Sequence, residues 1–286
     1  MILIADSGST KTDWRLIVDG KISESFQSSG INPTLQALEE IAEDQLSTLK
    51  PFEHLPIKQV HFYGAGCTQI LAKAKIEKML GGIFTAAKTN VSSDLLGAAK
   101  AIFNHSPGIA CILGTGSNSG LFDGTKIVEN IPSLGYLLGD EGGGNQIGKR
   151  LLIDYLRADM PIHISKTLKS DIGDDRAAIY DRLYQRPFPN RFLASMVQLV
   201  SEYHADDVYF RAVIEKEFDR FFVNCINKYQ TVNQVAVGFV GSLAFYFQDL
   251  LEVVASRHFI KIFGIVEKPI DALALQHSNQ FSKSFL

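Results

Sequence analysis

The sequence predicts an α/β protein whose two halves repeat one design. Each half opens with an apolar strand, a loop of glycine and hydroxyl residues, a second apolar strand and an Asp-Gly turn. The strands and turns are 2–5, 14–18 and Asp19-Gly20 in the first half, and 110–113, 121–123 and Asp123-Gly124 in the second. Asp-Gly between apolar runs is typical of a tight hairpin, because a type I′ turn needs positive φ at both central residues. The repeat therefore predicts two related domains.

Length and composition set the broad class. A chain of 286 residues is long for one hydrophobic core and sufficient for two domains. It is 46% hydrophobic and 21% charged with a net charge of −3, so it has no basic surplus for nucleic acid or an anionic membrane. Its cysteines, Cys67, Cys111 and Cys225, have no C-x-x-C spacing, which argues against disulfides or a zinc site. With no signal peptide or membrane-length apolar run expected, we predict a cytoplasmic protein.

The first half continues as alternating helices and strands. A third strand is expected at 21–26, and apolar residues at helical spacing predict a helix over 35–49. The remaining elements are predicted as strand 60–63, helix 69–80, strand 90–92 and helix 95–103. Three antiparallel strands followed by such an alternation is the order of a ribonuclease-H-like domain. We place this domain at residues 1–107.

The second half repeats the opening and then departs from it. After the strands at 110–113, 121–123 and 126–129, the pattern predicts a helix at 146–156, short helices over 159–192, and a long helix with a wide apolar face at 206–228. A buried strand at 235–240, a helix from Leu243 and a strand at 259–265 complete this half. We place a second ribonuclease-H-like domain at 108–269, with a helical insertion at about 159–229. A terminal helix, 270–286, is expected to pack on the first domain.

The two loops of small residues are candidate phosphate-binding sites. The first follows Asp6 and contains Gly8, Ser9, Thr10, Lys11 and Thr12. It is not a P-loop, which needs G-x-x-x-x-G-K-[ST] and opens a helix. A tight hairpin rich in backbone N–H groups and hydroxyls can still hold phosphates, and a carboxylate such as Asp6 can bind the accompanying Mg²⁺. The alternative is a plain β-turn with a solvated aspartate.

A second loop of the same kind makes a phosphate clamp more plausible than two unrelated turns. Gly114, Thr115, Gly116 and Ser117 follow the first strand of the second half, as Ser7-Gly8-Ser9-Thr10 follow the first strand of the chain. Facing loops from two related domains would grip the phosphates from both sides. Gly241 and Ser242, after a buried strand, either form a tight turn or let an adenine ring approach the backbone.

Two polar positions have both a structural and a functional interpretation, and a third has a structural one. Asp94 stands where a strand ends and a helix begins, so it is either a helix N-cap or a general base at the ligand-binding edge of the sheet. Asp140-Glu141, before a run of three glycines, is either a charge pair at a helix N-terminus or a sugar-hydroxyl acceptor. Asn32, before Pro33, is typical of a turn.

The motifs, taken in order, resemble the N-acetylglucosamine kinase family, which belongs to the superfamily of sugar kinases, actin and heat-shock chaperones. They are the two hairpin loops, S-S-D-L-L-G-A-A, I-L-G-T-G-S-N, L-L-G-D-E-G-G-G and V-G-F-V-G-S, and they cover nearly the whole chain, most weakly across 159–229. The resemblance implies an actin-like ATPase fold with a cleft between two lobes. It also implies an ATP- and Mg²⁺-dependent kinase of a small aminosugar, N-acetylglucosamine or glucosamine.

The same resemblance implies a role for each candidate residue. Asp94 would be the general base on the sugar hydroxyl, and Asp6 would serve Mg²⁺. The phosphates would be held by Gly8, Ser9, Thr10, Lys11, Thr12, Thr115 and Gly116, the adenosine by Gly241 and Ser242, and the sugar by Asn32, Asp94, Ser117, Asn118 and Asp140. Vertebrate members have a tryptophan in the sugar-site turn, where this chain has Leu134-Gly135-Tyr136, and this keeps glucosamine open beside N-acetylglucosamine. The resemblance also implies a possible homodimer, because dimers are common in the superfamily.

Two alternatives from other functional classes remain. The fold and loops also occur in the activator ATPases of 2-hydroxyacyl-CoA dehydratases, which hold an iron–sulfur cluster between two subunits through cysteines. The cysteines of this chain follow no cluster spacing. A catalytically silent sugar sensor would bind sugar tightly without ATP turnover.

Overall fold

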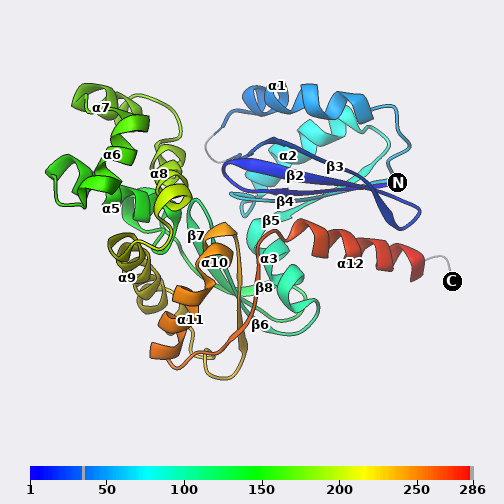
Figure 1. Ribbon diagram of the computed structural model, residues 1–286. Helices are drawn as coiled ribbons and strands as arrows, with labels where there is room; N and C mark the ends of the chain where they lie inside the picture. The colour runs from blue at the N-terminus through cyan, green and yellow to red at the C-terminus, as the bar shows by residue number, and fades with distance from the viewer. Residues whose placement is uncertain (34–35, 284–286) are drawn as a thin grey trace. The chain divides into compact units, whose positions relative to one another are not determined.

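The computed structural model of the protein describes residues 1–33 and 36–283 (Figure 1). The first residue of the helix expected at 35–49 and the last three of the helix expected at 270–286 therefore lie outside the described residues. The chain forms two compact units. Unit 1 contains Met1–Gly108, Phe122–Val128 and Lys268–Leu286, and unit 2 contains Ile109–Leu121 and Glu129–Glu267. Among the described helices, none is long and apolar enough to span a membrane.

Unit 1 is built on a five-stranded sheet in the order β3-β2-β1-β4-β5. Its strands are β1 (Ile2–Ser7), β2 (Lys11–Val18), β3 (Lys21–Ser29), β4 (Gln59–Gly64) and β5 (Lys88–Ser93). β2 runs antiparallel to both β1 and β3, whereas β4 runs parallel to both β1 and β5. The β2–β3 turn has φ of 48° at Asp19 and 75° at Gly20, so the predicted positive φ at both residues is confirmed.

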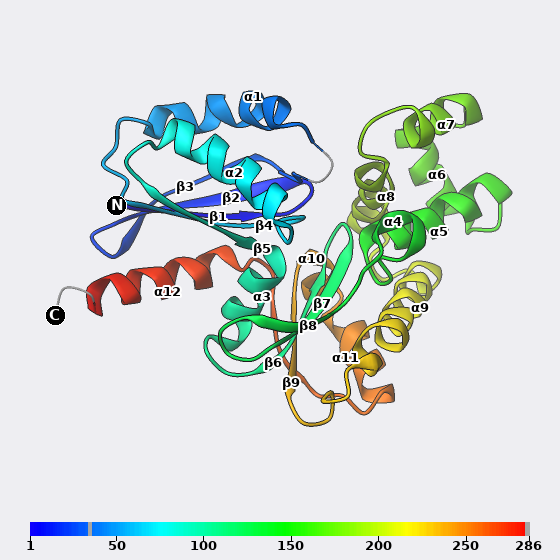
Figure 2. The ribbon, with the colours of Figure 1, turned by 180° about the vertical axis from the view of Figure 1, so that it is seen from behind.

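Helices cover both faces of this sheet, because alternate residues of each strand point to opposite sides (Figures 1 and 2). The helices of unit 1 are α1 (Leu38–Leu49), η1 (Lys50–Phe52), α2 (Ile70–Ile83), α3 (Asp94–Phe103) and α12 (Ile270–Lys283). On one face Leu3 and Trp14 pack in a core that includes residues of α1 and α2, such as Ile41 and Ile76. On the other face, Ile4 packs against Leu273 of α12.

Unit 2 repeats the strand order of unit 1. Its sheet runs β10-β9-β6-β7-β8, with β6 (Gly108–Leu113), β7 (Ser117–Phe122), β8 (Ile127–Ile131), β9 (Ala236–Val240) and β10 (Ile262–Val266). If β6, β7 and β8 are matched to β1, β2 and β3, the two orders are the same. The predicted duplication of a ribonuclease-H-like design is confirmed in the sheet topology.

The β7–β8 turn differs from the prediction. Gly124 has a positive φ of 101°, but Asp123 does not have a positive φ. Instead, the Asp123 carboxylate accepts hydrogen bonds from the N–H groups of Thr125 and Lys126 at 2.8 and 2.9 Å. The type I′ expectation is wrong here, because an aspartate side chain can close a wider turn by bonding the backbone two residues on. This hairpin tip belongs to unit 1, where a Cβ on Gly124 would lie 2.4 Å from the His105 carbonyl oxygen.

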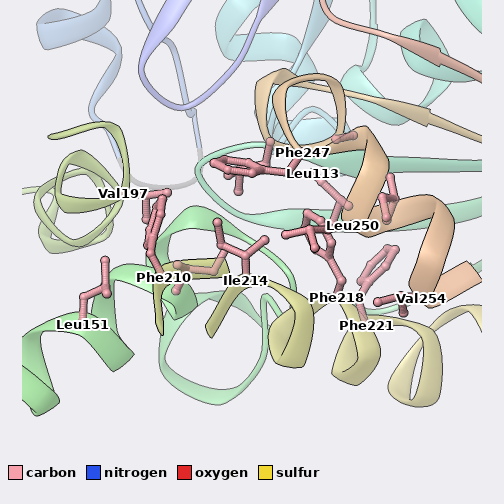
Figure 3. Close-up of a cluster of buried hydrophobic side chains, with 14 of the residues drawn as sticks. Leu113, Leu151, Val197, Phe210, Ile214, Phe218, Phe221, Phe247, Leu250 and Val254 are labelled. Atoms are coloured by element: carbon pink, nitrogen blue, oxygen red, sulfur yellow. The ribbon is translucent and has the colours of Figure 1, made fainter. Parts of the chain in front are cut away.

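The helices of unit 2 pack around a large apolar core. They are α4 (Gly135–Leu138), α5 (Gly144–Arg157), α6 (Ile162–Ile172), α7 (Arg176–Tyr184), α8 (Pro189–His204), α9 (Val208–Asn224), η2 (Ile226–Lys228), α10 (Ser242–Tyr246) and α11 (Gln248–Arg257). Figure 3 shows α9 directing Phe210, Ile214, Phe218 and Phe221 into this core, at the helical spacing read from the sequence. Leu113, at the end of β6, belongs to the same core. The start of the loop that follows β6 is therefore anchored in the core of unit 2.

Candidate active site

The β1–β2 hairpin of unit 1 holds the first predicted phosphate loop in one tight shape. The Gly8 N–H donates to the Lys11 carbonyl at 3.0 Å, and the Gly30 N–H donates to the Thr10 carbonyl at 3.1 Å. A Cβ on Gly30 would lie 2.6 Å from the Gly8 carbonyl oxygen, so this approach requires glycine. Ser9 lies at the turn between these contacts. The loop is therefore braced by the end of β3 as well as by its own hairpin.

A buried pair of hydroxyls connects this loop to the segment that carries Asn32. The Ser7 and Thr12 hydroxyls lie 2.7 Å apart, Thr12 donates to the Ser29 carbonyl at 3.0 Å, and Ser7 accepts from the Ile31 N–H at 3.1 Å. Because its hydroxyl is engaged inside the unit, Thr12 presents its backbone rather than its side chain to a ligand. Asn32 follows directly after Ile31, so unit 1 brings it beside the loop.

Asp6 lies near the end of β1, the central strand of this sheet. Its cross-strand partner on β2 is Asp13. Burial, together with the charges of Asp94 and Asp13, raises the pKa of Asp6 to about 7, while the charge of Lys11 acts in the opposite direction. Hard carboxylate oxygens in an excess of negative charge fit Mg²⁺, which takes one or two protein carboxylates together with water and phosphate oxygens. Asp6 has the chemistry of such a ligand.

Asp94 is the first residue of α3, not its cap. The N-cap is Ser93, whose hydroxyl accepts from the Leu96 N–H at 3.2 Å, so the interpretation of Asp94 as an N-cap is wrong. Burial raises the pKa of Asp94 to about 6, opposed by a 2.8 Å hydrogen bond from the Leu95 N–H. Asp94 is thus a carboxylate whose pKa suits proton transfer near neutral pH.

In unit 2, the second predicted phosphate loop is tied to the start of α5. Gly144 and Asn145 donate their N–H groups to the Gly114 and Thr115 carbonyls, both at 2.8 Å. The first amides of α5 are therefore used to shape the loop. Because β7 begins at Ser117, the loop proper is shorter than the sequence predicts and contains Gly114, Thr115 and Gly116.

Gly241 lies against the same loop. It has a φ of 119°, and a Cβ at this position would lie 2.2 Å from the Leu113 carbonyl oxygen, just before Gly114. Only glycine combines this backbone conformation with so close an approach. Ser242, which follows it, is the first residue of α10. Unit 2 thus brings the predicted phosphate and adenosine residues to one edge of its sheet.

Asp140 lies at the same edge in a left-handed conformation, with φ of 58°. Its carboxylate accepts from Asn145 Nδ2 at 2.6 Å, and also from the Ser117 N–H and the Ser133 hydroxyl. Burial raises its pKa, and these hydrogen bonds act in the opposite direction. The structure therefore brings Asp140 and Ser117 together.

The charge-pair interpretation of Asp140-Glu141 is wrong. α5 starts at Gly144 and has no acidic residue in its first turn. Glu141 instead accepts from Asn224 Nδ2 at 2.9 Å.

The comparisons with known proteins agree with this arrangement. No family model and no curated protein sequence matches the chain. A crystal structure of a candidate N-acetylglucosamine kinase from Porphyromonas gingivalis is 37% identical, covers 98% of this chain and 100% of its own, and superposes with a TM-score of 0.91. The chain belongs to the N-acetylglucosamine kinase family. It is therefore an ATP-dependent sugar kinase.

More distant structures share the fold. A candidate N-acetylglucosamine kinase from Chromobacterium violaceum is 19% identical with a TM-score of 0.68, over 97% of this chain and 98% of its own. A ROK family glucokinase from Streptomyces griseus, solved with glucose and AMPPNP, is 13% identical with a TM-score of 0.64, over 99% of both chains. The predicted actin-like sugar kinase fold is confirmed.

Three further residues of this N-acetylglucosamine kinase family member lie in different environments. Asn118 lies on β7, and its Oδ1 accepts from the Ser119 N–H at 2.9 Å and from Asn130 Nδ2 at 3.0 Å. Leu134 is 63% exposed just before α4, in a left-handed conformation with φ of 62°. Trp14 is fully buried in unit 1, stacked on Phe26, and serves the core.

The sequence reasoning missed Asn145 and Ser133. Neither belongs to a recognisable motif. Asn145 directly follows the three glycines after Asp140-Glu141. This position was the one feature of the sequence that could have indicated a functional role for Asn145.

Proposed function

We propose that this sugar kinase transfers the γ-phosphoryl group of ATP to a hydroxyl of a hexosamine, N-acetylglucosamine or glucosamine. One observation carries the proposal. Within unit 1, a carboxylate with a pKa of about 6, Asp94, lies close enough to Asp6 to raise that residue's pKa, on a sheet whose β1–β2 hairpin forms the phosphate loop. A proton acceptor, a cation ligand and a phosphate cradle on one sheet are the parts that phosphoryl transfer to an alcohol needs.

Backbone donors within each unit would bind the phosphates of the nucleotide. The Gly8, Ser9, Thr10, Lys11 and Thr12 hairpin and the Thr115-Gly116 loop offer amides to the phosphates, and the Lys11 ammonium adds positive charge. Asp6 would hold Mg²⁺, which when bound neutralises phosphate charge. Gly241 and Ser242 would lie along the adenosine, where the absence of a Cβ at Gly241 leaves room.

The sugar hydroxyl would be activated by Asp94. As the hydroxyl oxygen bonds to the γ-phosphorus, its proton passes to the Asp94 carboxylate, the β–γ bridging bond breaks and ADP leaves. A positioned base of this kind contributes roughly 10²–10⁴ in rate. Asn32, Ser117, Asn118 and Asp140 would orient the sugar ring through its other polar groups. Positioning and charge neutralisation, rather than covalent catalysis, would supply the remaining acceleration.

The activator ATPase alternative finds no support at the cysteines. Cys67, Cys111 and Cys225 are unbonded and 0%, 0% and 3% exposed, whereas a cluster shared by two subunits needs cysteines at the surface. Within residues 1–33 and 36–283, no group of three or more His, Cys, Asp or Glu could hold a metal ion. A colourless, iron-free purified protein is expected, and bound iron would restore the alternative.

The test is ADP release from Mg·ATP with glucosamine, N-acetylglucosamine, N-acetylmuramic acid, N-acetylmannosamine and glucose, each across a concentration series. We expect strong turnover with one of the first two sugars. Turnover with glucose alone would overturn the hexosamine assignment. Hydrolysis of ATP that no sugar stimulates would favour the activator ATPase, and tight sugar binding without ATP turnover would favour the sensor.

A further inference from the structure

Asn145 is a fully buried amide that bonds two parts of the unit 2 site. Its backbone N–H donates to the Thr115 carbonyl at 2.8 Å, and its side-chain Nδ2 donates to Asp140 Oδ2 at 2.6 Å. One residue thus connects the phosphate loop to the carboxylate proposed to bind the sugar. The orientation of the amide is fixed, because a flipped Oδ1 would face the carboxylate and repel it.

Two buried acceptors beside this contact lack a partner. Among the residues that the structure describes, neither Asn145 Oδ1 nor Ser117 Oγ has a hydrogen-bond partner, although Asn145 is 0% and Ser117 6% exposed. Unpaired buried polar atoms cost free energy, so they are expected where a ligand or an ordered water supplies the missing group. The contact between Asn145 and Asp140 therefore belongs to a site prepared for a polar ligand.

The Asp140 carboxylate needs such support. Its burial disfavours the charged form of the carboxylate. A hydrogen bond from a neutral amide favours the ionised carboxylate without adding charge. It also restricts rotation of the carboxylate, and thus determines which carboxylate oxygen remains available to a ligand.

We propose that Asn145 is a positioning residue, which holds the Asp140 carboxylate ionised and oriented to accept a sugar hydroxyl. This inference rests on the proposed function, because it assumes that Asp140 binds the sugar. A purely structural role would affect the stability of the fold but would not separate sugar binding from ATP binding.

The test compares Asn145→Leu with a matched control, Asn224→Leu. Asn224 forms the same kind of amide–carboxylate bond, at 2.9 Å, with Glu141, which the proposed function does not place against the sugar. Calorimetry measures the Kd of each protein for the sugar, and turnover assays measure the KM for ATP. Asn145→Leu is expected to weaken sugar binding about tenfold or more with the KM for ATP changed less than about twofold. Asn224→Leu is expected to leave both within about twofold.

Asn145→Asp gives a second, pH-dependent signature. The introduced carboxyl would share a proton with Asp140 at acid pH and so donate a hydrogen bond as the amide does, whereas at alkaline pH the two charges repel. The other groups facing Asp140 are the Ser117 N–H, the Ser133 hydroxyl and the charge of Glu141. Sugar affinity of this variant should recover toward wild type from pH 8 to pH 6, while that of Asn145→Leu should remain weak at both.

The outcomes separate this inference from the proposed function. Sugar binding that is unchanged in Asn145→Leu, or weakened equally in Asn224→Leu, overturns the positioning role. Wild-type protein that binds sugar without phosphorylating it overturns the kinase reaction but leaves the Asn145 comparison valid. Wild-type protein that binds no sugar overturns both the proposed function and the positioning role of Asn145, because Asp140 then binds no sugar.

Discussion

The hydroxyls of Ser7 and Thr12, at the two ends of the β1–β2 hairpin, lie 2.7 Å apart in the fully buried interior of unit 1. Thr12 also bonds the Ser29 carbonyl, and Ser7 also bonds the Ile31 N–H. Two small side chains thus join β1, β2, the end of β3 and the segment that leads to Asn32. The shape of the phosphate loop depends on a polar network beneath it rather than on the loop residues alone.

Thr12→Val should therefore weaken both stability and nucleotide binding. Valine has the same shape but removes the two buried hydrogen bonds that the Thr12 hydroxyl makes to Ser7 and to the Ser29 carbonyl, which costs about 1–3 kcal/mol of unfolding free energy. The looser hairpin should raise the KM for ATP more than that for the sugar. Urea unfolding and initial-rate kinetics measure the two effects, with Thr68→Val, at an exposed position, as the control. A variant that loses stability and keeps its KM for ATP would show that the network does not shape the loop.

Asp94→Asn should fold and bind sugar but lose roughly 10²–10⁴ of kcat, because the amide cannot accept the hydroxyl proton. In the wild type, kcat/KM should rise as the pH increases through about 6, where Asp94 loses its proton, and should level off above 7. Bound Mg²⁺ would move this limb to lower pH. Asp94→Asn should lack this rise of kcat/KM with pH, and Asp44→Asn, on the exposed side of α1, should retain it. Near-wild-type turnover by Asp94→Asn would remove this residue from the reaction.

The sequence predicted those parts of the molecule that depend on local rules. Strand and helix positions in unit 1 followed from apolar periodicity, and the Asp19-Gly20 turn followed from its φ requirement. Motif order and resemblance gave the family. Asp94 could be proposed as a functional residue because it lies between a strand end and a helix, and Asp140 because it precedes a glycine run in a motif that resembles the family.

What the sequence did not predict depends on contacts between distant residues. Asn145 gains its role from a side chain five positions earlier and a carbonyl thirty positions earlier, and no spacing rule describes that pair. α8 was largely missed, because the short helices were predicted only over 159–192, whereas the structure has one helix from Pro189 to His204 with the proline at its first position. The width of the β7–β8 turn depended on whether Asp123 bonds its own backbone.

A pair of half-buried histidines should lower the stability of unit 1 in acid. The rings of His61 on β4 and His277 on α12 are 3.9 Å apart, and His277 Nε2 lies 3.0 Å from the Tyr63 hydroxyl. Burial, with the charge of Lys100, lowers the pKa of His61 to about 4 and that of His277 to about 3. Because the unfolded chain takes up these protons near pH 6.5 and the folded chain does not, stability falls as the pH drops from about 6.5 toward 4.

His277→Gln should reduce this acid sensitivity. The amide can still bond the Tyr63 hydroxyl but does not titrate, so between pH 7 and pH 5 the variant should lose about 1–2 kcal/mol less unfolding free energy than the wild type. Thermal unfolding followed by circular dichroism at both pH values measures the difference. His54→Gln, at an exposed position, is the matched control and should follow the wild type. Equal acid sensitivity in wild type and His277→Gln would show that the pair does not determine it.

Asp6→Asn should make the metal-free protein more stable while abolishing turnover. The folded protein raises the pKa of Asp6 from its ordinary 3.8 to about 7, so folding binds a proton that the unfolded chain has released. The contribution of Asp6 to the stability of the wild type should accordingly decrease as the pH rises from about 4 to 7, whereas the variant has no charge to bury. At pH 8 without metal, Asp6→Asn is expected to be more stable by about 1–3 kcal/mol. Adding Mg·ATP should raise the Tm of the wild type and have little effect on the variant. A variant that is stabilised by Mg·ATP as much as the wild type would mean that the cation is held elsewhere.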